Sequence, residues 1–115
     1  MPLKLFMDRD LSYLLDIFEA AKLAISYVSN KTEQAFLSDI QCQDSVIRRF
    51  EIIGEAAKRV SESTRLDYPE LPWNEMIGMR NLLIHEYDDV DMDILWKTVQ
   101  IELPKLVKQL EAILD

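Results

Sequence analysis

The sequence predicts an all-α protein, a bundle of about four or five helices. Apolar residues recur at spacings of three and four along nearly the whole chain, which is the helical period. The 115 residues include only two Gly and four Pro, too few for the many turns of an all-β fold. With 49% hydrophobic and 30% charged residues, the composition is typical of a folded protein. The length fits one domain spanning residues 1–115.

The first predicted helix runs from about Arg9 to Val28. Its apolar residues are spaced by three and four, and Asp8 or Asp10 is available to cap its N-terminus. The polar residues that begin at Asn30 interrupt the pattern. We therefore expect the chain to turn there.

The second helical segment is expected from about Thr32 to Ser61, in one or two pieces. Ser38 and Gln41 have the spacing of a capping box, which predicts that a long helix starts there. Its predicted apolar stripe is Ile40, Ile47, Phe50, Ile53, Gly54, Ala57 and Val60. The polar residues 61–72 include two prolines and predict a loop.

A third helix is predicted from about Trp73 to His85, and a fourth from about Met92 to Leu114. Asp91 is the expected N-cap of the fourth helix. Pro104 falls inside that helix and predicts a kink or break, since proline removes a backbone donor. The predicted apolar side of this helix is Ile94, Leu95, Val99, Leu103, Leu106, Leu110 and Ile113.

Charge and cysteine content narrow the function classes. The net charge of −8 argues against bulk electrostatic binding to duplex nucleic acid, but it leaves room for a small cationic cleft. The single cysteine, Cys42, cannot form an internal disulfide and suits a reducing cytoplasm. No apolar run exceeds three residues, so no membrane span or signal peptide is predicted. We expect a cytoplasmic protein.

The third helix carries a dense group of polar residues in an otherwise apolar stretch: Arg80, Asn81, His85 and Tyr87. Helical geometry places all four on one wide polar face. Histidine transfers protons near neutral pH, and the arginine fork binds phosphate. The group therefore suits cleavage of RNA without a metal. Because one histidine cannot easily be both base and acid, a two-fold dimer would have to supply the second copy.

The spacing of Arg80 and His85 alone has a second interpretation. His85 could be favoured at a helix C-terminus by the helix dipole, with Arg80 paired to a nearby acid. Both interpretations stay open on the spacing alone.

These residues resemble the signature of the HEPN superfamily, and specifically its HepT-like toxin branch. That signature, Arg-x4-His-x-Tyr, is met by Arg80, His85 and Tyr87, with the expected polar residue at Asn81. Other parts of the chain resemble the same family in the same order: residues 10–17, 52–58, 72–73, 77–81, 90–91, Trp96 and 103–104. The resemblance covers nearly the whole chain.

The resemblance implies a HEPN bundle that forms a homodimer and acts as a metal-independent ribonuclease toxin, with no cofactor. Arg80 and His85 would be catalytic and Asn81 would assist. It also implies a partner, a minimal nucleotidyltransferase antitoxin, which can transfer AMP from ATP to the tyrosine that here is Tyr87. The adenylate would block the RNA phosphate from Arg80; neutralisation by complex formation alone is the alternative.

Two sets of charged residues have open roles. The basic residues of the second segment and its exit are candidates for RNA-backbone contacts, or are ordinary surface charge: Arg48, Arg49, Lys58, Arg59 and Arg65. The carboxylates after His85 are a solvated turn with a helix cap, or a surface that docks a basic antitoxin: Glu86, Asp88, Asp89, Asp91 and Asp93. Glu55 could orient Arg80 or His85, or be a surface acid.

The sequence raises two functions other than the nuclease. A non-catalytic HEPN dimer could serve as the binding partner or substrate of a nucleotidyltransferase, but the intact signature favours the enzyme. A metal-binding bundle needs paired Glu-x-x-His motifs, and a chain with one histidine has no such pair, so no metal site is expected.

Overall fold

The computed structural model describes residues 2–78 and 91–114, and within α1 the side chains from Arg9 onward. The elements are α1 (Pro2–Val28), α2 (Glu33–Leu37), α3 (Ile40–Arg59), α4 (Glu62–Asp67), a helix at residues 73–78, α6 (Met92–Lys97), a π-helical segment (Thr98–Glu102) and α7 (Leu103–Leu114). No strand occurs among these residues, which confirms the all-α prediction. None of the described helices is long and apolar enough to cross a membrane.

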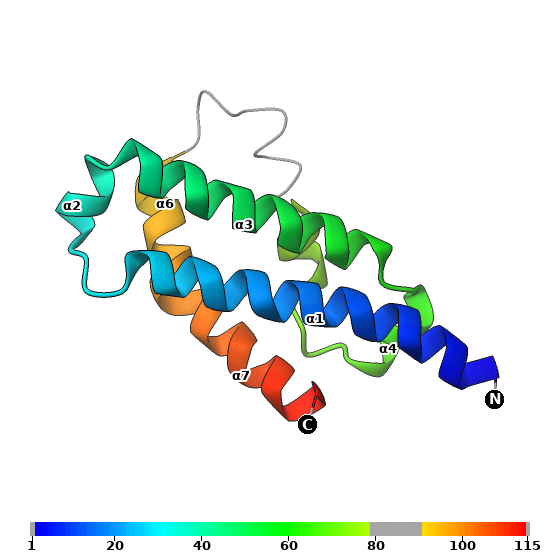
Figure 1. Ribbon diagram of the computed structural model, residues 1–115. Coiled ribbons are helices and arrows are strands. Elements are labelled where there is room, and N and C mark those ends of the chain that lie inside the picture. Colours follow the sequence, from blue (N-terminus) through cyan, green and yellow to red (C-terminus); the bar gives the residue numbers. More distant parts are fainter. Residues whose placement is uncertain (1, 79–90, 115) are drawn as a thin grey trace.

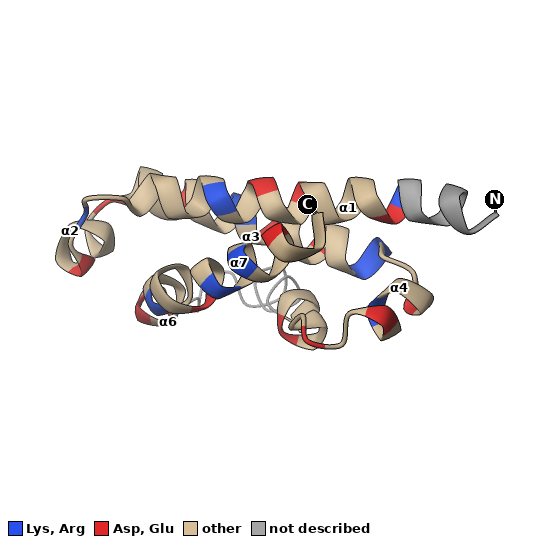
Figure 2. Cartoon of the chain, turned by 90° about the horizontal axis from the view of Figure 1, so that it is seen from below, with Lys and Arg blue, Asp and Glu red and all other residues tan. Residues whose placement is uncertain are grey.

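The two longest helices, α1 and α3, run antiparallel and form one layer of the bundle (Figure 1). Seen along this layer, α4, α6 and α7 all lie on the same side of it (Figure 2). The molecule is correspondingly flat, with extents of 51 × 29 × 20 Å. One side of the α1–α3 pair is therefore covered by the shorter helices.

The core lies between α1, α3 and the C-terminal helices, and it confirms most of the apolar stripes predicted for the second and fourth segments. In the first helix, Leu11, Leu15 and Leu23 continue the apolar spacing but are exposed. Ile17, Val46 and Leu110 are fully buried, one each from α1, α3 and α7. On α2, Phe36 is also fully buried, and its ring centroid lies 5.4 Å from that of Trp96 on α6. The short helix α2 is thus held against α6 by an aromatic pair.

The first helix begins seven residues earlier than predicted, and neither predicted cap is at its start. α1 starts at Pro2, so Asp10 lies inside the helix and is 3% exposed. Its carboxylate accepts hydrogen bonds from the backbone N–H of Ser61 (3.1 Å), from the Ser61 hydroxyl (2.6 Å) and from the Thr64 hydroxyl. The prediction that Asp10 caps its own helix was wrong: its carboxylate instead holds Ser61, the N-cap residue of α4.

The second segment is two helices, and its long helix is capped one residue later than predicted. Ser38 belongs to the end of α2, where its hydroxyl donates to the carbonyls of Gln34 and Ala35. The N-cap of α3 is Asp39, which accepts a bond from the Cys42 N–H at 3.0 Å. Ile40 is 72% exposed and was wrongly placed in the core stripe, because it is the first residue of the helix and lies beyond its buried face.

The predicted loop after α3 contains the helix α4. Ser61 is its N-cap and accepts a bond from the Thr64 N–H at 3.2 Å. The Arg65 side chain donates back to the carbonyls of Val60 (3.1 Å) and Lys58 (2.7 Å), which satisfies the C-terminal end of α3. These hydrogen bonds at the junction of α3 and α4 stabilise α4, a short helix whose sequence has no apolar period.

The fourth segment breaks where proline predicts. Asp91 caps α6 as expected, accepting bonds from the N–H groups of Asp93 (2.9 Å) and Ile94 (3.4 Å). The helix then becomes π-helical over residues 98–102, and Pro104 is the second residue of α7. Pro104 has no N–H to donate to the carbonyl four residues earlier, so a regular α-helix is interrupted. Ile94, which was predicted to be apolar-facing, is 57% exposed.

Replacing Gln43 with Ala should weaken the joint between α2 and α3. The buried Gln43 amide donates to the carbonyls of Phe36 (2.9 Å) and Leu37 (3.1 Å) at the end of α2. Losing both bonds should lower the free energy of unfolding by about 1–3 kcal/mol, measured by urea denaturation. Gln41→Ala, at an exposed site on the same helix, should change it by less than about 0.5 kcal/mol. Equal losses in both variants would contradict this role.

Candidate functional site

The predicted catalytic residues and the predicted modification site lie outside the described residues. Arg80, Asn81, His85 and Tyr87 all fall within residues 79–90. The structure describes the helices that border this segment and the basic face of α3. These determine how the candidate site is connected to the bundle.

The helix that precedes Arg80 is anchored at its beginning. Trp73 is 8% exposed, and its indole N–H donates to the carbonyl of Tyr68 at 2.9 Å. Met76, one turn later, is buried in the core. The position of Trp73 therefore fixes residues 73–78 against the rest of the protein.

The segment that follows the candidate site is anchored by the start of α6. Asp91 caps this helix, and Trp96 packs against Phe36. The Asp93 carboxyl hydrogen-bonds to Glu33 of α2, and this bond raises the pKa of Glu33. Two of the five clustered carboxylates are thus engaged by a helix cap and by α2, and the other three lie outside the described residues.

The four basic residues of α3 proposed to contact RNA do not form one patch. At about 100° per residue, Arg48 and Arg59 are about 20° apart and share a face, whereas Arg49 and Lys58 are about 180° apart. A single strand of RNA lying on one face of α3 therefore cannot contact all four. The structure divides them into candidates with different surroundings.

Two of these basic residues, Arg48 and Arg59, each have an acidic residue one helical turn away. The Arg59 guanidinium lies 2.9 Å from the Glu55 carboxylate, and the Arg48 guanidinium lies 3.8 Å from that of Glu51. Both pairs are largely exposed, so each contributes little to stability, but the acids offset the positive potential. Glu55 is half-buried on the same face; its proposed role in orienting Arg80 or His85 stays a prediction.

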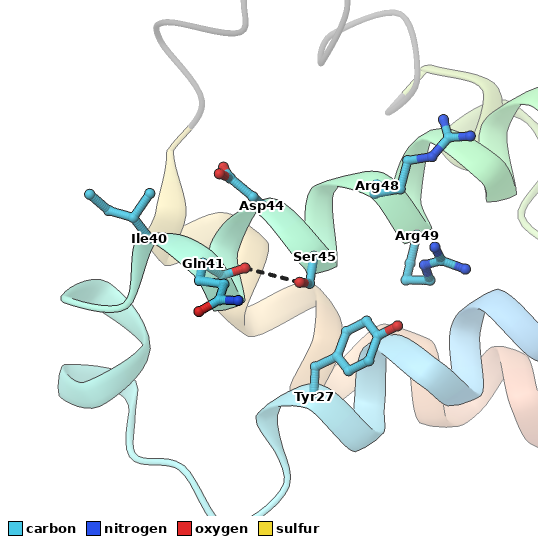
Figure 3. Close-up of a pocket in the computed structure, with 7 residues that line it drawn as sticks. All are labelled: Tyr27, Ile40, Gln41, Asp44, Ser45, Arg48 and Arg49. Carbon is cyan, nitrogen blue, oxygen red and sulfur yellow. Dashed lines mark hydrogen bonds between the residues drawn. The ribbon is translucent and has the colours of Figure 1, made fainter.

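Arg49 differs from the other three. It is half-buried, and its Nε atom is buried with no hydrogen-bond partner among the described residues. It lines a concavity of about 500 Å³ between α3 and the end of α1 (Figure 3). The lining residues are Tyr27, Ile40, Gln41, Asp44, Ser45, Arg48 and Arg49. Sequence reasoning missed Tyr27, because only the antiparallel packing of α1 on α3 brings it beside Arg49.

Comparison with known proteins identifies the family. A family model described as "Ribonuclease HepT-like" matches residues 17–113, which is most of the chain and includes positions 80–87. The chain belongs to the ribonuclease HepT-like family. This confirms the resemblance drawn from the sequence, and with it the HEPN-type bundle as the fold.

Named relatives of this family are similar over nearly their full length. The chain is 43% identical over 101 residues to "Probable ribonuclease HepT" of Thermococcus cleftensis, covering 88% of this chain and 92% of that protein. It is 37% identical over 102 residues to "Putative RNase MJ1380" of Methanocaldococcus jannaschii, covering 89% and 94%. No solved structure showed significant similarity to the chain.

Proposed function

We propose that this protein is a metal-independent RNA endonuclease that acts as the toxin of a type II toxin–antitoxin system. The observation that carries the proposal is the family match over residues 17–113, within which Arg80, His85 and Tyr87 keep the Arg-x4-His-x-Tyr spacing. The anchored helix at residues 73–78 and the capped start of α6 support it, since a catalytic segment needs rigid elements on both sides.

In the proposed reaction, the 2′-oxygen of a ribose attacks the neighbouring phosphodiester of the same RNA strand and cleaves it. His85 of one subunit takes the proton from the 2′-hydroxyl, which attacks the adjacent phosphorus. The bond to the 5′-oxygen breaks, and a protonated His85 of the second subunit gives that oxygen its proton. Arg80 neutralises the charge on the phosphorane oxygens, and Asn81 donates a further hydrogen bond. The products are a 2′,3′-cyclic phosphate and a free 5′-hydroxyl.

The homodimer is part of this proposal, because the reaction needs a base and an acid and the chain has one histidine. A two-fold axis beside the segment that carries His85 would bring two histidines and two copies of Arg80 into one cleft. Sedimentation of the purified protein should give twice the mass of one chain.

The proposed antitoxin is a minimal nucleotidyltransferase. It would inhibit the nuclease by joining AMP to Tyr87: the phenol oxygen attacks the α-phosphorus of ATP, pyrophosphate leaves and the phenol proton is lost. The added phosphate is negative and would compete with RNA for Arg80. Intact mass after co-expression with a minimal nucleotidyltransferase should show one or more added adenylates, absent in Tyr87→Phe.

Cleavage of RNA in the presence of EDTA is the direct test of the activity. The purified protein should cut single-stranded RNA at an undiminished rate when divalent ions are chelated, because no step uses a metal. The new 3′ ends should resist a polymerase until the cyclic phosphate is opened and removed. Loss of cleavage with EDTA and its return with Mg²⁺ would refute the metal-independent mechanism.

A further inference from the structure

We propose that the concavity between α1 and α3 is a phosphate-binding subsite in which Arg49, flanked by Tyr27 and Ser45, holds a backbone phosphate of single-stranded RNA. The inference rests on the proposed nuclease function and adds a site that is separate from Arg80 and His85. It selects one of the four basic residues of α3 that the sequence alone could not tell apart.

The first argument is the state of the Arg49 side chain. Within residues 2–78 and 91–114, its Nε–H is buried without an acceptor and no carboxylate forms an ion pair with its guanidinium. An N–H that has left water without gaining an acceptor costs free energy, and native proteins rarely keep one. If the side chain turned this Nε–H toward the concavity, a bound anion would supply the missing acceptor. Arg48 and Arg59, by contrast, already have acidic partners.

The second argument is the shape and chemistry of the surroundings. Figure 3 shows the Arg49 guanidinium on the side of α3 that faces α1, where the Tyr27 ring also lies, while the Arg48 side chain points away from α1. The Ser45 side chain also lines the concavity; its hydroxyl donates to the carbonyl of Gln41 at 3.0 Å and would have to turn from that carbonyl to donate to a phosphate oxygen. An arginine fork with an aromatic ring beside it suits a phosphate whose base stacks on the ring.

The third argument is charge. The chain carries −8 overall, yet this concavity is lined by two arginines and one carboxylate, that of Asp44. Because Glu51 offsets the Arg48 charge and Asp44 is a carboxylate, the groove is close to neutral, and it repels an anion less than the rest of this acidic protein does. The volume of about 500 Å³ exceeds what one phosphate needs, and it fits a nucleotide unit of a longer strand.

Binding of a labelled single-stranded RNA oligonucleotide, followed by fluorescence anisotropy across a salt series, tests the site. All proteins carry His85→Ala so that the RNA stays intact. Arg49→Gln should raise Kd about tenfold and reduce the salt slope by about 0.7, the loss of one phosphate contact to a single strand. Lys108→Gln removes the same charge from an exposed site on α7 and should leave Kd within about twofold.

A second variant covers the case in which Arg49→Gln does not fold. Arg49→Lys keeps the charge and the aliphatic stem but lacks the Nε–H and the planar fork. It should keep the parent salt slope while Kd rises severalfold. A Kd equal to the parent's in both variants overturns the proposal. A change in the sedimentation of the variants with no change in RNA binding also overturns it, because the concavity would then be a contact with a second copy of the chain.

Two further measurements separate this site from the activity and from a nucleotide site. In the cleaving protein, Arg49→Gln should raise KM and leave kcat unchanged, since Arg49 does not touch the reacting phosphate. If Arg49→Gln cleaves RNA with the KM of the unchanged protein, the subsite is rejected and the nuclease proposal stands. If the unchanged protein does not cleave RNA but its RNA binding depends on Arg49, the nuclease is rejected and the subsite stands. Competition by AMP or inorganic phosphate as strong as by the oligonucleotide would overturn the RNA assignment.

Discussion

His85→Ala is expected to abolish RNA cleavage while leaving RNA binding and the fold intact. In the proposed mechanism this imidazole serves as base in one subunit and as acid in the other, so one substitution removes both proton transfers. General acid and base catalysis each contribute about 10²–10⁴-fold, so the rate should fall by at least about 10³-fold. The measurement is the initial rate of oligonucleotide cleavage under single-turnover conditions, with thermal unfolding as the check on folding.

Mixed dimers make this test sharper. When unchanged chains are refolded with an excess of His85→Ala chains, nearly all unchanged subunits are paired with a mutant one, and the activity is counted per unchanged chain. If both histidines act in one cleft, these mixed dimers should be about as inactive as the double mutant. Normal activity per unchanged chain, which is half of the normal activity of a dimer, would show that each histidine works alone, and residual cleavage by His85→Ala itself would remove this residue from the mechanism.

The pH profile follows from the same mechanism. A reaction that needs one neutral and one protonated imidazole gives a bell-shaped dependence of the rate on pH, with its maximum near the ordinary histidine pKa of about 6.5. A matched control is Lys105→Ala, at an exposed residue of α7, whose profile should coincide with that of the unchanged protein. A single sigmoidal limb would indicate that only one histidine titrates in the reaction.

The apolar stripes could be predicted from the sequence because helical period and burial coincide in the middle of each helix. Ile47, Phe50 and Leu110 are buried as their spacing predicts. The errors lie on one side of α1, where Leu11, Leu15 and Leu23 are 41–42% exposed, and at helix ends. Ile40 and Ile94 continue an apolar spacing but stand at the first turns of α3 and α6, where no neighbouring helix covers them.

Caps and short helices were the least predictable features, since they depend on contacts between distant parts of the chain. Ser61 reads as the start of a polar loop, and only the carboxylate of Asp10, 51 residues away, makes it the anchored N-cap of α4. In the same way, Arg49 is one of several basic residues in the sequence. Its distinction comes from the packing of Tyr27 from α1 beside it, which no spacing within α3 encodes.

Asp10→Asn should destabilise the protein by about 3 kcal/mol, the largest effect we expect from a single polar substitution among the described residues. The carboxylate accepts three hydrogen bonds from Ser61 and Thr64, and bonds to a charged group are worth about 1.5–3 kcal/mol each before non-additivity. Asparagine keeps the shape but offers one acceptor oxygen and a buried amide that has no acceptor. Urea unfolding gives the loss, and Asp16→Asn, at an exposed site of α1, should change it by less than about 0.5 kcal/mol.

The pH dependence of the stability lost in Asp10→Asn tests whether the charged carboxylate is the source of that stability. Burial raises the pKa of Asp10, but the hydrogen bonds from Ser61 and Thr64 outweigh burial and hold it below its ordinary value. A folded-state pKa below the unfolded one gives stability that is complete above about pH 4 and is lost as the pH falls through the folded value. The difference in the free energy of unfolding between the unchanged protein and Asp10→Asn should therefore decrease as the pH is lowered. A difference that stays constant or widens below pH 4 would show that shape, and not the negative charge, joins α1 to α4.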